Sequence, residues 1–450
     1  MRFYDPLYGQ ITVPADFTAL INTTHFRRLQ FLRQLGLCVL SFPGGNHTRF
    51  EHCLGAFHLA SAIAQALPSS GPLPPDEQRR LGFLLQLAAL CHDIGHGPFS
   101  HMTENVLHGL GASCSHEDVG AALIVGPLRD LFAPFAASGV TPEMVASVIT
   151  HTPSSDAVVR CVTELVSSDL DVDRLDYLHR DSHYTGVGQR FRGLLADLED
   201  AWLLKRHGES LYFELTDTGI AFAERVLFLR RGNYQRIVYE SRHMAATAMF
   251  EKATVAALEG HSPFSNDLKN VVGLHLNWQD EATRTAALET AWRVNGLVDF
   301  EAVRALATSS PEAGYLLQRV REANLYESVF RAGWQELHYL AKQRLLAVKG
   351  ARSSFQLRRS LESQLATANH VDLKHVAVHI PEIRLPRPLT LGVKDGRTLE
   401  DASDLGRFFA ADAIRQYAVE VFVDRDVPRV DRDAVAAVAS SIFKLGTTSF

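Results

Sequence analysis

The most informative stretch of this sequence places three histidines and an aspartate within residues 90–102. His92-Asp93 follows a run of good helix formers at residues 78–91, and the glycines and proline of residues 95–98 are typical of a helix end. Burying so many ionisable groups costs free energy unless a metal ion or an anion binds them. The stretch therefore predicts a site for such a ligand.

Two further stretches contain side chains of related chemistry. Residues 47–52 hold two histidines, an arginine and a glutamate, and residues 169–181 hold five acidic residues. Unless cations are near, these acidic groups repel one another, so we expect their helix to turn a polar face toward a metal. Helical spacing puts the following residues on one face: Asp169, Asp173, Tyr177, Arg180 and Asp181.

Helices must position these side chains. Apolar periodicity predicts helices at residues 17–35, 52–67 and 78–91, with a loop at residues 41–46 and a break at residues 68–75. Helical patterns continue to residue 255, apart from a hairpin at residues 209–216.

The texture changes after residue 260. Helical patterns run to about residue 365, and β-type runs at residues 375–380 and 417–423 then flank a helical segment at residues 405–415. We predict a mainly α fold with a small mixed α+β C-terminal region. Its two domains would be residues 1–255 and residues 256–450, the second serving in oligomerisation or as a lid.

Composition excludes several classes of protein. The chain of 450 residues is 46% hydrophobic and 21% charged, as globular proteins are, and its net charge of −6 gives no general attraction to nucleic acid or anionic membranes. Its five cysteines form no C-x-x-C pair, which predicts a reducing, cytoplasmic location. The first residues resemble no secretory signal, and the longest apolar run, residues 81–90, is too short to cross a membrane.

The order of these motifs resembles a known family. A histidine, an HD pair followed by Gly-His-Gly-Pro-Phe-Ser-His, and a later aspartate are similar to the HD-domain phosphohydrolases. The similarity is strong over residues 1–250, implies an HD-domain helical bundle, and points to the deoxynucleoside triphosphate triphosphohydrolase (dNTPase) branch, which includes animal enzymes with a SAM domain. Four motifs carry this narrower resemblance: residues 5–9 (Asp-Pro-Leu-Tyr-Gly), 33–36 (Arg-Gln-Leu-Gly), 49–52 (Arg-Phe-Glu-His) and 171–177 (Asp-Val-Asp-Arg-Leu-Asp-Tyr).

The resemblance implies four metal ligands: His52, His92, Asp93 and Asp173. Two imidazoles and two carboxylates suit Mn, Fe, Zn, Co or Ni, or Mg with lower selectivity, so we expect a divalent metal cofactor. A cation held by them would lower the pKa of bound water and withdraw charge from a phosphate.

The family reaction splits a deoxynucleoside triphosphate (dNTP) into deoxynucleoside and inorganic triphosphate. By resemblance, His96 and His101 touch the α-phosphate and the water, and Glu104 fixes one of these histidines. His116 is the implied general acid, oriented with Glu117, and an imidazole suits that role because its pKa lies near neutral pH.

Substrate contacts are implied in the same way. The arginines and tyrosines interleaved at residues 225–243 offer phosphate forks and ring surfaces, although an ordinary exposed helix is the alternative. His47 is interpreted as an ordinary surface or core histidine, and Arg28 as part of a solvated helix face or an oligomer contact. The implied phosphate contacts are Arg49, Arg174, Arg231, Tyr239 and Arg242, and the implied sugar contacts are Gln34, Leu35, Tyr177 and Asp181.

Two positions depart from the family members that a guanine nucleotide activates. Asn22 stands where those members carry Asp, and Gln30 where they carry Arg. An amide cannot accept hydrogen bonds with both of its terminal atoms, as a carboxylate can. We expect a homo-oligomer, either a dimer or a tetramer, but do not expect guanine-nucleotide activation to carry over.

Two alternatives remain open. One is an HD-type phosphatase or phosphodiesterase acting on nucleoside monophosphates, modified nucleotides or oligonucleotide ends. The other is a nucleotide-sensing or single-strand nucleic-acid-binding scaffold without activity. The arginine-rich segment favours a polyphosphate substrate, the complete ligand set favours an enzyme, and the net charge disfavours a nucleic-acid groove. Base preference, native metal and cellular role, in nucleotide-pool balance or phage defence, are not decided by sequence.

Overall fold

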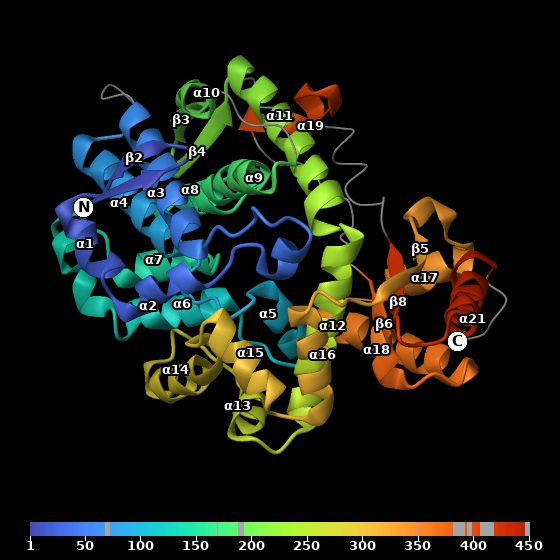
Figure 1. Cartoon of the computed structure of the whole chain (residues 1–450). Helices are drawn as coiled ribbons and strands as arrows, with labels where there is room; N and C mark the ends of the chain where they lie inside the picture. The colour runs from blue at the N-terminus through green and yellow to red at the C-terminus, as the bar shows by residue number, and fades with distance from the viewer. Residues whose placement is uncertain are drawn as a thin grey trace.

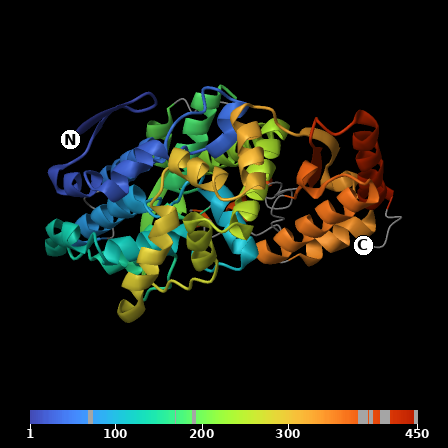
Figure 2. The ribbon, with the colours of Figure 1, turned by 60° about the horizontal axis from the view of Figure 1, so that its bottom comes forward.

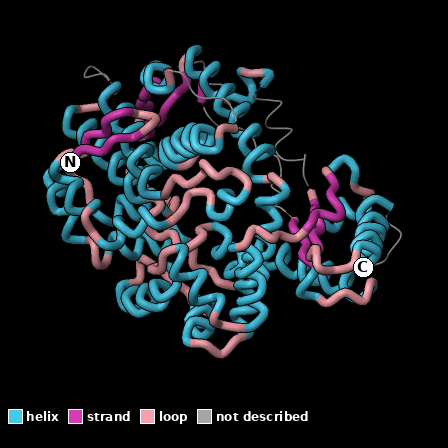
Figure 3. Tube along the Cα trace, in the orientation of Figure 1, coloured by secondary structure: helices cyan, strands magenta, loops and turns pink. Residues whose placement is uncertain are grey.

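A computed structural model describes residues 1–67, 73–168, 170–187, 193–348, 350–380, 392–393, 398–405 and 418–445. These residues are mainly helical with small sheets, which confirms the predicted fold class (Figure 1). A large helical body contains the N-terminal half, and a three-stranded sheet with its own helices lies beside it toward the C-terminus (Figures 2 and 3).

The N-terminal segment departs from prediction. The single helix expected at residues 17–35 is wrong, because the chain leaves the helix at Asn22 and the Thr23 hydroxyl caps a new one by accepting the Phe26 N–H at 3.2 Å. An antiparallel hairpin that we did not predict precedes these turns. The elements are β1 (Arg2–Asp5), β2 (Gly9–Thr12), α1 (Ala15–Ile21), α2 (Thr24–Arg27), η1 (Arg28–Phe31) and η2 (Gly36–Leu40).

The helical body follows. The predicted helices at residues 52–67 and 78–91 are confirmed, each beginning three residues earlier than expected. Its helices are α3 (Arg49–Ala66), α4 (Pro75–Cys91), α5 (His101–Leu110), α6 (His116–Val125), η3 (Arg129–Ser138), α7 (Pro142–Ile149), α8 (Ala157–Val166), α9 (Val172–Thr185), α10 (Leu194–Ala201), α11 (Asp217–Asn233), the π-helical turn η4 (Tyr234–Val238) and α12 (Ser241–Glu259).

A reciprocal cap fixes where α3 starts. The Thr48 side chain accepts the Glu51 N–H, and the Glu51 carboxylate accepts the Thr48 N–H at 2.7 Å. This early start puts Arg49 and His52 one turn apart on the same helix.

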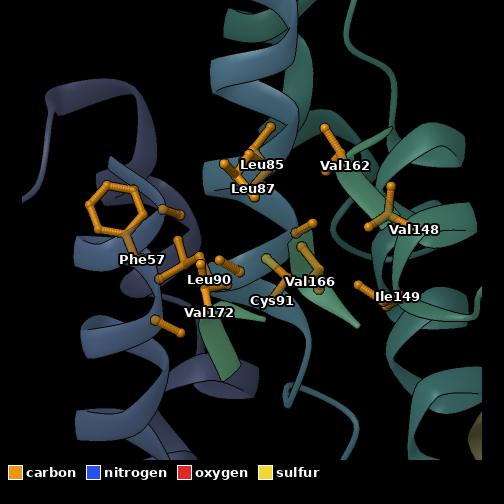
Figure 4. Close-up of a cluster of buried hydrophobic side chains, with 14 of the residues drawn as sticks. Phe57, Leu85, Leu87, Leu90, Cys91, Val148, Ile149, Val162, Val166 and Val172 are labelled. Carbon is orange, nitrogen blue, oxygen red and sulfur yellow. The ribbon is translucent and has the colours of Figure 1, made fainter. Parts of the chain in front are cut away.

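The main hydrophobic core adjoins His92 and Asp93. Burial of each large apolar side chain contributes roughly 1.5–3 kcal/mol, and α4 delivers its apolar residues into this core up to its last residue. His92 and Asp93 follow at once, so the core sets their position. The labelled side chains of Figure 4 come from α3 (Phe57), α4 (Leu85, Leu87, Leu90, Cys91), α7 (Val148, Ile149), α8 (Val162, Val166) and α9 (Val172).

The hairpin expected at residues 209–216 is present, but that range covers only its second strand. β3 (Trp202–His207) pairs antiparallel with β4 (Ser210–Leu215) around a turn at Gly208, whose φ of +56° suits glycine. The short β7 (Gly392–Val393) adds to β4 in parallel, so a segment remote in sequence joins the sheet.

The C-terminal sheet has the order β5-β8-β6, with both pairs antiparallel. The β-type runs at residues 375–380 and 417–423 are confirmed over their described residues, but β5 was not predicted, and the helix expected at residues 405–415 falls almost wholly outside the described residues. The strands are β5 (Glu327–Ala332), β6 (Val376–His379) and β8 (Val419–Val423).

Helices connect the helical body to the part of the chain that contains the C-terminal sheet. α12 runs through residue 255, where we predicted a domain boundary, and packs on α5, α16 and β6. The helices after it are α13 (Pro263–Val272), α14 (Glu281–Asn295), α15 (Asp299–Ala307), α16 (Pro311–Arg321), η5 (Trp334–Glu336), α17 (Tyr339–Ala347), α18 (Gly350–Ala368), η6 (Leu373–His375), α19 (Leu399–Ala402), α21 (Arg429–Ser440) and the π-helical η7 (Ser441–Leu445).

Within the described ranges, no single helix has both the length and the apolar character needed to cross a membrane, although the bent pair α6 and η3 meets both criteria when taken together.

A glycine sets the distance between α3 and α9. A Cβ at Gly55 would lie 1.9 Å from Asp176 Oδ1 and 2.4 Å from Arg180 Nη2. We expect Gly55→Ala to lower the free energy of unfolding by about 1–3 kcal/mol, because a buried carboxylate and its arginine must move. Urea unfolding measures this loss. Gly232→Ala, in α11 with no atom within 4 Å of the new Cβ, is the control and should not destabilise. Equal stability of the two variants would contradict the close contact.

Candidate functional site

The four residues predicted as metal ligands converge from three elements. His52 lies on α3, His92 and Asp93 at the end of α4, and Asp173 in the first turn of α9. The Nε2 atoms of His52 and His92 are 3.1 Å apart, and Asp173 Oδ1 lies 2.9 Å from the first and 3.6 Å from the second. Ligand atoms of His52, His92 and Asp93 all lie within 4.8 Å of one another.

Hydrogen bonds to groups outside the ligand set fix the orientation of the His52 and His92 imidazoles. His52 Nδ1 donates to the Asp176 carboxylate at 2.8 Å, and His92 Nδ1 donates to the Ala89 carbonyl at 2.9 Å. A neutral imidazole that donates from Nδ1 presents a lone pair at Nε2. Two lone pairs and two carboxylates therefore face one small volume, and this donor set fits a divalent cation.

Charge favours a cation in the same place. Burial opposes protonation of His52, but Asp173 and Asp176 outweigh it and raise the pKa of His52 to about 10. The pKa of Asp173 is held well below its ordinary value by His52 and His92, against the effect of burial. Binding of a metal would replace the proton on this cluster, so binding should release protons.

Arg49, a predicted phosphate contact, lies against the ligand set. Its Nη1 pairs with Asp93 and its Nε donates to the Ser100 hydroxyl, and the side chain is buried. Burial raises the pKa of Asp93, but Arg49, His92 and His96 together hold it well below the ordinary value. Asp93 therefore stays a carboxylate.

The predicted catalytic residues form a second cluster beside the first. His96, His101, Glu104 and His116 have ligand atoms within 4.8 Å of one another. Glu104 accepts from Nδ1 of His101 at 3.0 Å and from Nδ1 of His116 at 3.1 Å, so it contacts two histidines where we expected one. Glu117 Oε1 lies 3.3 Å from His116 Nε2, and its orienting role stays a prediction.

The environments of two stacked histidines push their pKa values apart. The rings of His96 and His116 stack at 3.6 Å with 13° between their planes. Burial, Arg49 and His116 hold the pKa of His96 well below its ordinary value. Burial also opposes protonation of His116, but Glu104 outweighs it and raises the pKa of His116 to about 9. At neutral pH, one ring is neutral and the other is charged.

The loop that carries these histidines has an unusual backbone. Phe99 and Ser100 adopt φ values of +55° and +50°, a left-handed region that costs free energy for residues other than glycine. The turn delivers His101 as the first residue of α5. Such strain persists only when surrounding contacts hold it.

Three of the predicted sugar contacts are partly buried: Gln34, Leu35 and Tyr177. Gln34 donates its N–H to the His47 carbonyl at 3.0 Å, and its Oε1 is a buried atom without a hydrogen-bond partner among the described residues. Leu35 is half-buried beside it. Tyr177, also half-buried, has its pKa raised by burial and by Tyr234, and therefore stays a neutral phenol.

Asp181 lies in a buried pair that the sequence did not reveal. Its Oδ1 is 2.8 Å from His47 Nε2, and the His47 ring stacks on Tyr184. His47 is thus buried and paired with a predicted sugar contact. Its burial agrees with the core alternative of our interpretation. No local pattern indicated this pairing, because the two residues are 134 positions apart in sequence.

The predicted phosphate contacts come from separate elements. Arg174 lies on α9 beside Asp173, with its Nε 3.5 Å from Asp171. Arg231 lies in the last turn of α11 and is half-buried, and Arg242 is the second residue of α12 and is exposed. Tyr239 follows the π-helical turn η4, a feature frequent at functional sites. The phosphate roles of these residues stay predictions.

One arginine is placed differently from expectation, and another has partners that we did not predict. Arg28 is buried, donates to the Ile94 carbonyl at 2.8 Å and lies over the Trp292 ring, so its assignment to a solvated face is wrong. Arg180 lies on α9, as the polar face we predicted requires, but it is fully buried and pairs with Asp176 and Asp5, and Asp169 of that face lies outside the described residues. The burial of Arg28 arises from partners remote in sequence.

Comparison with known proteins agrees with the site. Residues 49–181 match the family model of the HD domain, a range that contains all four predicted ligands. An uncharacterized protein (YwfO) of Bacillus subtilis is 35% identical over 46% of this chain and 46% of that protein. The deoxynucleoside triphosphate triphosphohydrolase SAMHD1 homolog of Dictyostelium discoideum is 33% identical over 40% of this chain and 36% of that protein. The chain spans about half the length of the curated relatives it matches.

Solved structures share the fold. A phosphohydrolase from Bacteroides thetaiotaomicron superposes with a TM-score of 0.67 at 22% identity, covering 94% of this chain and all of that one. A hypothetical protein from Aquifex aeolicus gives a TM-score of 0.63 at 20% identity over 97% of this chain and 99% of its own. These findings show an HD domain at residues 49–181, a fold shared with two solved structures, and distant, partial similarity to a dNTPase homolog.

Removal of one carboxylate should empty the metal site. We expect Asp93→Asn to lower bound Mn²⁺ at least about tenfold, because the change removes a negative ligand beside Arg49. Elemental analysis after gel filtration measures the metal bound per chain. Asp76→Asn, 95% exposed at the start of the same helix, is the matched control. Equal metal content in both variants would refute the assignment of Asp93.

The Glu104–His116 pair should stabilise the protein in a pH-dependent way. Folded His116 keeps its proton up to about pH 9, whereas the unfolded chain loses it near about pH 6.5. The stabilisation is therefore complete below the lower value and declines as pH rises through the higher one.

We expect Glu104→Gln to lower the free energy of unfolding by about 1–3 kcal/mol at pH 6 and by less at pH 10. Urea titrations at the two pH values measure the difference. Glu143→Gln, an exposed partner of Arg129, should show no such pH dependence between them. An equal loss at both pH values for Glu104→Gln would exclude the charged pair.

Proposed function

We propose that the protein is a divalent-metal-dependent phosphohydrolase that converts dNTPs to deoxynucleosides and inorganic triphosphate. One observation carries the proposal: a donor set suited to a metal lies beside two stacked imidazoles with opposite protonation states. Pairs of titratable groups with separated pKa values are typical of acid and base partners in catalysis.

His52, His92, Asp93 and Asp173 would hold the metal. When bound, a divalent cation withdraws negative charge from a phosphate and makes water a better nucleophile near neutral pH. Arg49 lies against Asp93, so its positive charge is available within the same site.

The histidines would move the protons. His96 Nε2 donates to Asp93 at 3.2 Å, which leaves Nδ1 of this neutral ring to accept a proton from the attacking water. The water oxygen bonds to the α-phosphorus and the bond from phosphorus to O5′ breaks. His116, protonated at neutral pH, gives its proton to the departing O5′.

The proposal that the substrate is a dNTP rests on the predicted sugar and phosphate contacts. Gln34 Oε1, which has no hydrogen-bond partner among the described residues, can accept from a sugar hydroxyl, and the Tyr177 phenol is half-buried on α9. The arginines at residues 225–242 could bind the polyphosphate. The motif resemblance and the name of the Dictyostelium relative support the same substrate.

Two other functions stay as alternatives. A phosphatase or phosphodiesterase acting on monophosphates or oligonucleotide ends would use the same metal and histidines, and a nucleotide-sensing scaffold would bind nucleotide at these residues without turnover. We also propose that the protein is cytoplasmic, since all five cysteines are free, and that it forms a homo-oligomer.

Product analysis tests the proposal. Purified protein with Mg²⁺ or Mn²⁺ is incubated with each dNTP and NTP in ¹⁸O-labelled water. We expect deoxynucleoside and intact triphosphate, with ¹⁸O in the triphosphate because water attacks phosphorus. Asp93→Asn should lose at least about 100-fold in rate, and the exposed control Asp76→Asn should keep the full rate. Release of orthophosphate, or turnover of monophosphates only, would favour the alternatives.

A further inference from the structure

A buried carboxylate outside the matched domain links two parts of the site. Asp299 is the first residue of α15, and its side chain is buried. Its Oδ2 accepts the Arg33 N–H at 3.0 Å and its Oδ1 accepts the Phe99 N–H at 2.9 Å. Both oxygens of one carboxylate thus bind backbone that is far apart in sequence.

Each of these backbone groups leads into the candidate site. Arg33 precedes Gln34 and Leu35, the predicted sugar contacts, and forms an antiparallel bridge with Thr48. Phe99 is the first of the two left-handed residues that deliver His101 to the second cluster. One side chain therefore sets the distance between the substrate edge and the histidine loop.

The surroundings of Asp299 favour a fixed geometry. Asn295, at the end of α14, donates to the Gly95 carbonyl at 3.0 Å and lies against Gly97, so the same connection also supports the preceding part of the loop. Burial raises the pKa of Asp299, but the two N–H groups favour its charged form, as does its place at a helix N-terminus.

We propose that Asp299 is a positioning residue of the active site, which holds residues 33–35 and the strained turn at residues 99–100 in register. The inference rests on the proposed hydrolase function. Asp299 touches neither the predicted ligands nor, in our proposal, the substrate. Its effect passes through backbone that carries those groups, and displacement of a reacting group by about 1 Å can cost roughly 100-fold in rate.

Asp299→Asn is the main test. An amide has one accepting atom, so one N–H loses its partner and faces an NH₂ group instead. We expect kcat/KM for the best nucleotide to fall roughly 10- to 100-fold, with kcat lower and KM higher, because both the histidine loop and the sugar edge move. Bound metal should not change, because no metal ligand is altered.

Two further variants make the result interpretable. Asp299→Glu keeps the charge but lengthens the side chain, and we expect it to recover part of the lost activity. Asp280→Asn removes an exposed aspartate that caps α14 through the Ala282 N–H, and it should keep wild-type kinetics. A variant that is merely partly unfolded would lower kcat at constant KM, which separates damage to the fold from loss of positioning.

Amide hydrogen exchange supplies a readout that needs no substrate. In Asp299→Asn, the segments containing Arg33 and Phe99 should exchange faster, with residues 52–66 of α3 unchanged. If the wild type cleaves no nucleotide, the proposed function fails. The exchange pattern would still test whether Asp299 holds the two backbone segments. Unchanged exchange, or kinetics within twofold of wild type, would overturn the inference.

Discussion

The site depends on one fully buried carboxylate. Asp176 accepts from His52 Nδ1 and from Nε and Nη2 of Arg180, and Arg180 in turn reaches Asp5 of the first strand. An anion without solvent needs these partners, since an unpaired buried charge costs several kcal/mol, of the order of 3–5 kcal/mol when one partner is removed. Because α3 has a glycine at the crossing, α9 comes close enough for this arrangement. The direction of the His52 lone pair, and hence the donor set, follows from it.

Charges alternate outward from the donor set. Arg49 faces Asp93, Asp93 accepts from neutral His96, His96 stacks on charged His116, and His116 pairs with Glu104. No two like charges in this row are in direct contact, so a dense group of ionisable side chains can be buried without large repulsion. The same alternation gives neighbouring imidazoles different protonation states, which identical rings in water would not have. Stability and reactivity here have a common electrostatic origin.

Local patterns predicted the parts of the site that local chemistry determines. Apolar periodicity located α3 and α4, and the ordered motifs picked out His52, His92, Asp93 and Asp173, which the structure brings together. The predictions failed where two local signals competed, or where an element depends on a partner that is remote in sequence. A threonine cap divided the helix expected at residues 17–35, and the strand β5 gains its stability from β8, nearly a hundred residues away in the chain. The burial of Arg28, the link from Asp181 to His47, and Asp299 could not be read from spacing, since each depends on a remote partner.

The pairing of Asp5 with Arg180, together with the contact of Asp299 with Phe99, has a consequence for synthesis of the chain. Residues 49–181 match a domain model, but the groups that hold this segment in shape lie on both sides of it. On a ribosome, the early helices can collapse onto their shared core while the histidine loop still lacks the residues that fix its turn. Only after residue 299 has emerged can that loop settle. Excising the matched segment alone would thus yield a helical core with an unfinished centre.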